Sequence, residues 1–153
     1  MRYMNKLFIF PILLILAGCG VTKTICPCEA PEAIRLGEKI IEINAQISLN
    51  DTPELGGMKV KIWLTTQDHS PLPANLEADY YYLRSSNLTR TAFEGKFTTK
   101  RSDLLVGSLE LEANNAPSWG IGELVDVAVH LTDSRGKIHF VKKDAVKVLP
   151  AIH

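Results

Sequence analysis

Alternation of apolar and polar residues with a period of two is the feature that most constrains what this chain can fold into. Between Ile41 and Leu49, isoleucine, alanine and leucine at odd positions alternate with polar residues at even positions. Successive side chains of a β-strand point to opposite faces, so the pattern predicts a strand with one buried and one exposed face. Met58–Thr65 repeats the pattern and predicts a second strand, with Trp63 on its polar side.

Further strands are predicted at Tyr80–Arg84, Thr89–Thr99, Leu105–Glu112, Val125–Leu131 and Lys137–Val148. Gly95 lies inside the weakest of these and indicates a β-bulge. About seven strands without a long helix predict an all-β fold, namely an antiparallel β-sandwich of the immunoglobulin-like kind. The likeness is architectural, because the Cys…Trp…Cys pattern of antibody domains is missing from the sequence.

The last two strands predict a hairpin around a four-residue loop at positions 133–136. In this register Leu131 faces Ile138, and the apolar residues of both strands share one face. His130 and His139 then become cross-strand neighbours on the outer face. A register shifted by one residue would pair Leu131 with His139 and scatter the apolar residues, so we do not expect it.

The N-terminus has the parts of a secretory signal peptide. Arg2 and Lys6 precede an apolar run at Leu7–Leu16, which is interrupted only by Pro11. The run is too short to span a bilayer, which needs roughly 20 apolar residues. A basic start, a short apolar core and small residues after it are typical of a signal peptide.

The end of this segment, Leu16-Ala17-Gly18-Cys19, resembles the lipobox of bacterial lipoproteins. The resemblance implies that Cys19 receives a diacylglyceryl group, that a dedicated signal peptidase cuts before it, and that the new N-terminus is acylated. Gly20 in place of an aspartate implies passage to the outer membrane. We therefore expect a signal peptide at 1–18, a lipidated tether at 19–37 and a β-sandwich domain at 38–153.

The composition of residues 19–153 limits the kinds of partner that they can bind. These residues have the usual size of one domain. Of the 17 Lys+Arg residues in the whole chain, Arg2 and Lys6 leave with the signal peptide, so 15 remain against 17 Asp+Glu. This balance argues against a nucleic-acid partner, which needs a concentrated basic patch. Membrane attachment is expected to rest on acyl chains at Cys19.

Pro27 and Pro31 mark the tether, in which a short helix over Glu32–Glu38 is a weak alternative. Cys26 and Cys28 flank Pro27 and are interpreted as a linker feature. A metal pair would need further ligands that the neighbourhood lacks. A disulfide between them would close a tight, strained ring.

Two groups of residues are candidates for binding. Trp63, Trp119 and the tyrosines around Tyr81 could form an aromatic platform for a sugar or a protein, with core packing as the alternative. Alternation places Tyr81 on the face opposite Tyr80 and Tyr82. His130 and His139 could begin a metal site but lack a third ligand nearby, so no metal or other cofactor is predicted.

Catalytic motifs are missing from the sequence, and no catalytic residue is assigned. Asp68, His69 and Ser70 are adjacent, whereas catalytic triads are assembled from separate segments. The favoured function is a non-catalytic interaction or assembly module on an envelope lipoprotein, with an envelope protein as its partner. The alternatives are a glycan-binding or metal-binding lipoprotein and, third, a hydrolase with an unrecognised site.

Overall fold

A computed structural model describes residues 27–52, 56–87, 92–103 and 107–152. The lipobox, Cys19 and Cys26 lie outside the described residues, as does the side chain of Cys28. The described part is all-β, as predicted from the alternation. It holds nine strands and a 3₁₀ turn, η1 (Pro27–Glu29), but no α-helix.

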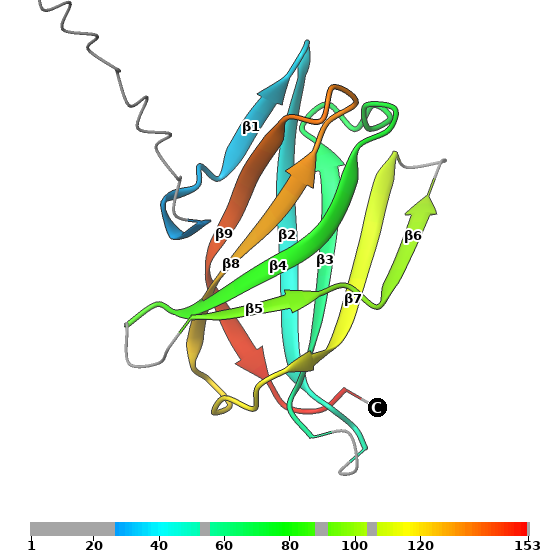
Figure 1. The fold of residues 1–153 in the computed structure, drawn as a ribbon. Coiled ribbons are helices and arrows are strands. Elements are labelled where there is room, and N and C mark those ends of the chain that lie inside the picture. The colour runs from blue at the N-terminus through cyan, green and yellow to red at the C-terminus, as the bar shows by residue number, and fades with distance from the viewer. Residues whose placement is uncertain (1–26, 53–55, 88–91, 104–106, 153) are drawn as a thin grey trace, which may run out of the picture.

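The strands are β1 (Ala33–Leu36), β2 (Lys39–Leu49), β3 (Met58–Thr66), β4 (Glu77–Ser85), β5 (Phe93–Lys96), β6 (Thr99–Asp103), β7 (Ser108–Ala116), β8 (Leu124–Thr132) and β9 (Ile138–Leu149). They form one sheet in the order β5-β4-β8-β9-β2-β3-β7-β6, and β1 pairs with β2 beside this path. The sheet curls so that β4, β5 and β8 cross in front of β2, β3 and β7 (Figure 1).

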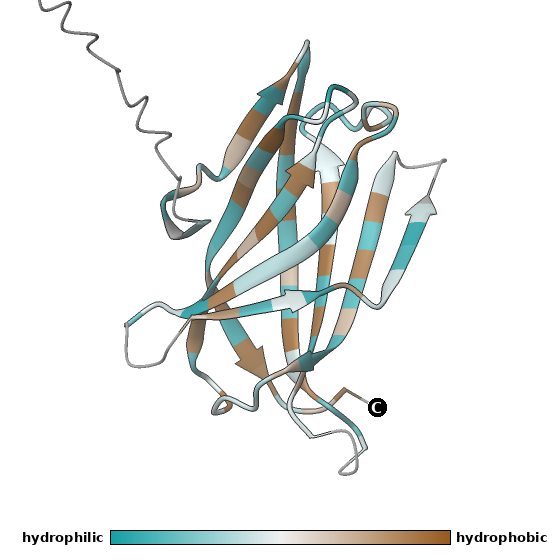
Figure 2. Cartoon of the chain, in the orientation of Figure 1, coloured by the Kyte–Doolittle hydropathy of each residue, from teal (hydrophilic) through white to brown (hydrophobic). Residues whose placement is uncertain are grey.

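The core lies between the two halves of the curled sheet. Alternate residues of β3 are fully buried, and their neighbours in the strand are half-buried on the outer face. The bands of hydropathy along the strands in Figure 2 follow this alternation. Burial of each large aliphatic side chain contributes about 1.5–3 kcal/mol relative to leaving it in water. The same hydrophobic cluster includes residues of β4, β8 and β9, among them Leu83, Val127, Val129 and Val141.

Nine strands replace the predicted seven for two local reasons. Residues 32–38 do not form the short helix considered above, because Ala33–Leu36 pairs with β2 through a two-residue turn in which Gly37 has a φ of 63°. Glycine at the first position of such a turn favours a hairpin. Residues 93–103 form two short strands, β5 and β6, on the two ends of the sheet order.

The predicted register of the β8–β9 hairpin is wrong by one residue. Asp133 N–H donates to the Lys137 carbonyl (3.0 Å), and Gly136 N–H donates to the Asp133 carbonyl (2.9 Å). The loop therefore has three residues and ends on Gly136 in the left-handed region, at a φ of 77°. Leu131 lies opposite His139, which is the pairing that we did not expect.

Burial explains why this register is the stable one. It places Val129 opposite Val141, and both side chains are fully buried. Ile138, which the predicted register turned inward, is instead 56% exposed.

Farther along β9 the pairing with β8 shifts, and Ala145 takes a positive φ of 56° there. This bulge changes the phase of the alternation, so Val148 is buried although Val141 and Val148 differ in parity.

Gly95 does not form the predicted bulge, because the β4–β5 register is continuous through the Tyr81–Gly95 pair. It leaves room for the buried ring of Tyr81, whose hydroxyl donates to Asn115 Oδ1 at 2.7 Å. A Cβ on Gly95 would lie 2.5 Å from Cζ of that ring. The ring also packs against Phe97 at a centroid distance of 5.2 Å.

We predict that Gly95→Ala lowers the free energy of unfolding by about 1–3 kcal/mol, because the added methyl group overpacks the contact with Tyr81. Urea unfolding measures the change. Gly120→Ala is the matched control, since its Cβ would meet nothing nearer than the Glu123 side chain at 3.9 Å. Equal stability of the two variants would contradict the packing role of Gly95.

Candidate interaction surface

Four rings gather on the outer side of β4, β8 and β9, and we call them the aromatic face: Tyr80, Tyr82, His130 and Phe140. Ring centroids of Tyr80 and His130 are 5.9 Å apart, those of His130 and Phe140 are 5.4 Å apart, and those of Tyr82 and Phe140 are 5.9 Å apart. Each pair meets edge to face. All four residues are half-buried and therefore keep part of their surface exposed to solvent.

Strand geometry produces this cluster. Tyr80, His130 and Phe140 are direct cross-strand partners in one row across β4, β8 and β9. Tyr82 follows two residues after Tyr80, and so it lies on the same side of the sheet. Edge-to-face pairs contribute about 0.5–1.5 kcal/mol beyond the area they bury. The rings therefore hold one another in place before any partner arrives.

The charges around the aromatic face are largely paired. Lys96 Nζ lies 5.1 Å from the centroid of the Tyr80 ring, within the range of a cation–π contact. Arg84 Nη2 donates to Asp126 Oδ2 at 3.1 Å. Lys142 Nζ lies 2.9 Å from Asp144 Oδ2. Paired charges are cheaper to cover with a partner than isolated ones, because less hydration is lost.

Two titratable groups at this surface have shifted pKa values. Burial raises the pKa of the Tyr82 phenol, and the Glu94 carboxylate raises it further. Burial alone would also raise the pKa of Asp126, but hydrogen bonds from the Ser86 hydroxyl, the Ala145 N–H and Arg84 hold it below its usual value. At neutral pH the phenol is therefore a neutral donor, and Asp126 is a carboxylate.

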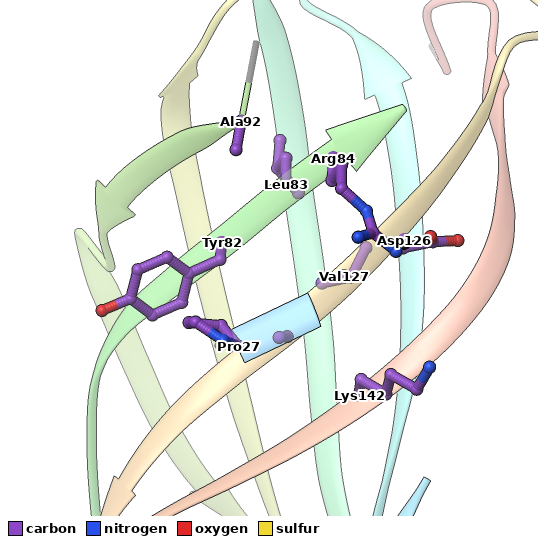
Figure 3. A pocket seen from close by; sticks show the side chains of 9 residues that line it. Pro27, Tyr82, Leu83, Arg84, Ala92, Asp126, Val127 and Lys142 are labelled. Atoms are coloured by element: carbon purple, nitrogen blue, oxygen red, sulfur yellow. Dashed lines mark hydrogen bonds and ion pairs between the residues drawn. The ribbon is translucent and has the colours of Figure 1, made fainter. Parts of the chain in front are cut away.

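An apolar cavity of about 170 Å³ opens beside the ring of Tyr82. Its walls include Tyr82 and Ala128, the Arg84–Asp126 pair lies along it, and Pro27 of η1 lies over β8 at its side (Figure 3). An apolar site of this size is comparable to the engineered cavities of about 150 Å³ that accept benzene. The cavity can therefore receive a small aliphatic or aromatic group.

The predicted aromatic platform does not come together. Tyr81 is fully buried, and Trp119 is 6% exposed and packs into the core. Trp63 lies on the outer side of β3, in the other half of the curled sheet, where its indole N–H donates to Glu110 Oε2 at 3.1 Å. Alternation did place Tyr80 and Tyr82 opposite Tyr81, as expected.

The histidine pair does not come together either, because of the one-residue change in register. His130 belongs to the aromatic face, whereas His139 is the cross-strand neighbour of Leu131. The Nε2 atom of His139 lies 2.9 Å from Asp133 Oδ2. Within residues 27–52, 56–87, 92–103 and 107–152, no three His, Cys, Asp or Glu side chains gather as metal ligands would.

Asp68, His69 and Ser70 form a turn. Asp68 Oδ1 accepts hydrogen bonds from the Ser70 N–H (3.1 Å) and from the Ser70 hydroxyl (2.6 Å). These bonds, the hydroxyl first, lower the pKa of Asp68 to about 2. The serine hydroxyl thus faces the carboxylate, whereas a catalytic triad directs it at the imidazole.

Sequence reasoning missed the role of Phe140 and Lys96 at this surface. The signal for Phe140 was present in the alternation of β9, but the assumed register turned this residue inward. Lys96 could be placed beside Tyr80 only after β5 was known to pair with β4.

No protein-family model matches the chain, and no curated protein is significantly similar to it. In the part of the chain that the structure describes, no helix has the length and apolar character needed to cross a bilayer.

The lowered pKa of Asp133 makes the stability of the protein depend on pH. Hydrogen bonds from His139 and from the Lys137 and Arg135 N–H groups lower its pKa to about 2 from 3.8. Because the folded pKa is below the unfolded one, the contribution of Asp133 to stability is present above about pH 4 and is lost as pH falls toward 2. We predict that Asp133→Asn destabilises the protein in urea unfolding at pH 6, and that the difference from wild type shrinks at pH 2. A difference that stays constant over this range would contradict the assignment.

Proposed function

We propose that the protein is a bacterial lipoprotein, anchored at Cys19 to the periplasmic face of the outer membrane, whose β domain is a non-catalytic interaction module. The lipobox-like sequence before Cys19 supports the anchor, and Gly20 supports the outer membrane. We further propose that the curled sheet is an immunoglobulin-like sandwich, with β4, β5 and β8 forming one layer. A domain of this kind recognises partners through exposed strands, loops and side chains.

The observation that carries the proposed interaction is the aromatic face. It joins a centre of four half-buried rings with a rim of paired charges, which is the composition of protein–protein interfaces. Tyrosine is enriched among residues that dominate binding energy. Because the rings already pack edge to face, little side-chain entropy is lost when a partner covers them. The proposed partner is an envelope protein that covers Tyr80, Tyr82 and Phe140.

A second candidate is binding of a small ligand such as a glycan. The cavity beside Tyr82 favours it, because a sugar ring could stack on the exposed side of the phenol. A glycan screen on the purified domain distinguishes the two: saturable binding that Tyr82→Ser abolishes would support this second function.

The interaction is tested by chemical crosslinking in membranes of the native organism. We predict that wild type yields a defined adduct with an envelope protein, and that Cys19→Ser and Tyr82→Ser each reduce its yield at least about tenfold. For Tyr82→Ser, a tenfold loss of affinity is equivalent to about 1.4 kcal/mol.

Trp63→Ser is the matched control, because it removes a large aromatic residue from the outer side of β3 and should leave the adduct unchanged. Circular dichroism confirms that each variant is folded. An adduct that survives Tyr82→Ser but disappears in Trp63→Ser would place the contact on the other half of the sheet and contradict the proposal.

A further inference from the structure

Strand β5 lies at one end of the sheet order, and one of its two long edges has no other described strand beside it. It pairs with β4 and lies along that strand on the front of the curled sheet (Figure 1). The pairing is continuous from Phe93 to Lys96, without the bulge that often protects such an edge. The side chains of Glu94 and Lys96 are exposed. A further strand can therefore pair with β5.

The direction of the backbone groups in β5 follows from the hydrogen bonds around it. Phe97 N–H donates to the Asp79 carbonyl at 3.1 Å, in the same register as the β4–β5 pairs. In an antiparallel pair, hydrogen-bonded and non-hydrogen-bonded positions alternate. Gly95 is therefore hydrogen-bonded to β4, whereas the N–H and carbonyl groups of Glu94 and Lys96 point to the free edge.

We propose that two copies of the protein pair antiparallel through β5, with Gly95 of one copy opposite Gly95 of the other. In this register Glu94 of each copy lies opposite Lys96 of the other copy. The outward backbone groups of these two residues then form four hydrogen bonds between the copies. Their side chains form two ion pairs on the outer side of the joined sheet.

Charge selects this register among those that keep the outer sides of both copies together. A pairing centred on Glu94 places two carboxylates opposite each other, and a pairing centred on Lys96 places two ammonium groups opposite each other. Like charges directly opposite destabilise a sheet, whereas opposite charges stabilise it. A shift by a single residue would place outer side chains of one copy beside inner side chains of the other. The register centred on Gly95 brings each charged residue to its opposite sign.

The inner side of the same edge also favours the pairing. Phe93 and Phe97 are half-buried and pack against the ring of Tyr81, at centroid distances of 6.1 and 5.2 Å. The proposed register places Phe93 of each copy opposite Phe97 of the other, so that these rings cover surface that a single copy leaves in water. Because β5 has four residues, the contact is smaller than a standard interface, and we expect a weak, reversible dimer.

This pairing would join the aromatic faces of two copies. A two-fold axis makes the contact self-complementary, and the strands would follow one another in the order β8-β4-β5-β5-β4-β8. Lys96 Nζ, which lies 5.1 Å from the centroid of the Tyr80 ring, would stand between that ring and Glu94 of the second copy. One partner would then contact both aromatic faces, a consequence that rests on the proposed function, whereas the dimer does not.

The test is sedimentation equilibrium of residues 19–153 with Cys19→Ser, in reducing buffer and over a range of protein concentrations. We expect this chain to form a reversible dimer. Glu94→Lys and Lys96→Glu should each weaken dimerisation at least about tenfold, because both ion pairs become repulsive. The two substitutions combined in one chain should restore the dimer, since unlike charges again lie opposite each other. Arg101→Glu is the matched control, because it reverses an exposed charge on β6, at the other end of the sheet order.

Three results would overturn the proposal. One is a monomer at every concentration, and another is a dimer that neither single charge reversal weakens more than Arg101→Glu does. The third is a double variant that dimerises no better than the single variants, which would exclude the register centred on Gly95. Circular dichroism confirms that each variant is folded. The sample contains neither lipid nor an envelope protein, so failure here is distinguishable from failure of the crosslinking experiment.

Discussion

The fold depends on the place where β9 pairs in parallel with β2, because this pairing joins the two halves of the sheet. Ile47 lies opposite Val148 and Ser48 opposite Leu149, and the neighbouring strand pairs elsewhere in the described sheet are antiparallel. Through this junction the buried residues of β3 and β7 share one core with those of β4 and β8. The same curl turns the outer side of β4, β8 and β9 away from the core, and so determines where the aromatic face lies.

Strands with an uninterrupted alternation could be predicted from the sequence. In β3, Val60, Ile62 and Leu64 are buried and Trp63 is on the outer side, as expected. The short strands could not be predicted, since β1 and β5 have four residues each and take their stability from pairing with a longer strand. The count of nine strands depends on these pairings, which are tertiary.

In the candidate site too, some positions could be predicted from the local sequence, whereas others depend on contacts between distant parts of the chain. Placement of Tyr80 and Tyr82 opposite Tyr81 follows from alternation alone. Phe140 was misplaced because a four-residue loop was assumed at positions 133–136, and this register turned Phe140 inward. The loop has three residues, which follows from its hydrogen bonds and not from the alternation. Trp119 lies in an irregular loop, where its burial depends on the packing of the whole sheet end and leaves no local pattern.

In our proposal, the protein is a lipoprotein that meets an envelope partner through the aromatic face. The most direct measurement replaces Tyr80 with a photo-crosslinking amino acid in the full-length protein in living cells, and compares it with the same replacement at Thr65, on the outer side of β3. We expect a defined protein adduct from position 80 and none from position 65. An adduct at position 65 without one at position 80 would contradict it.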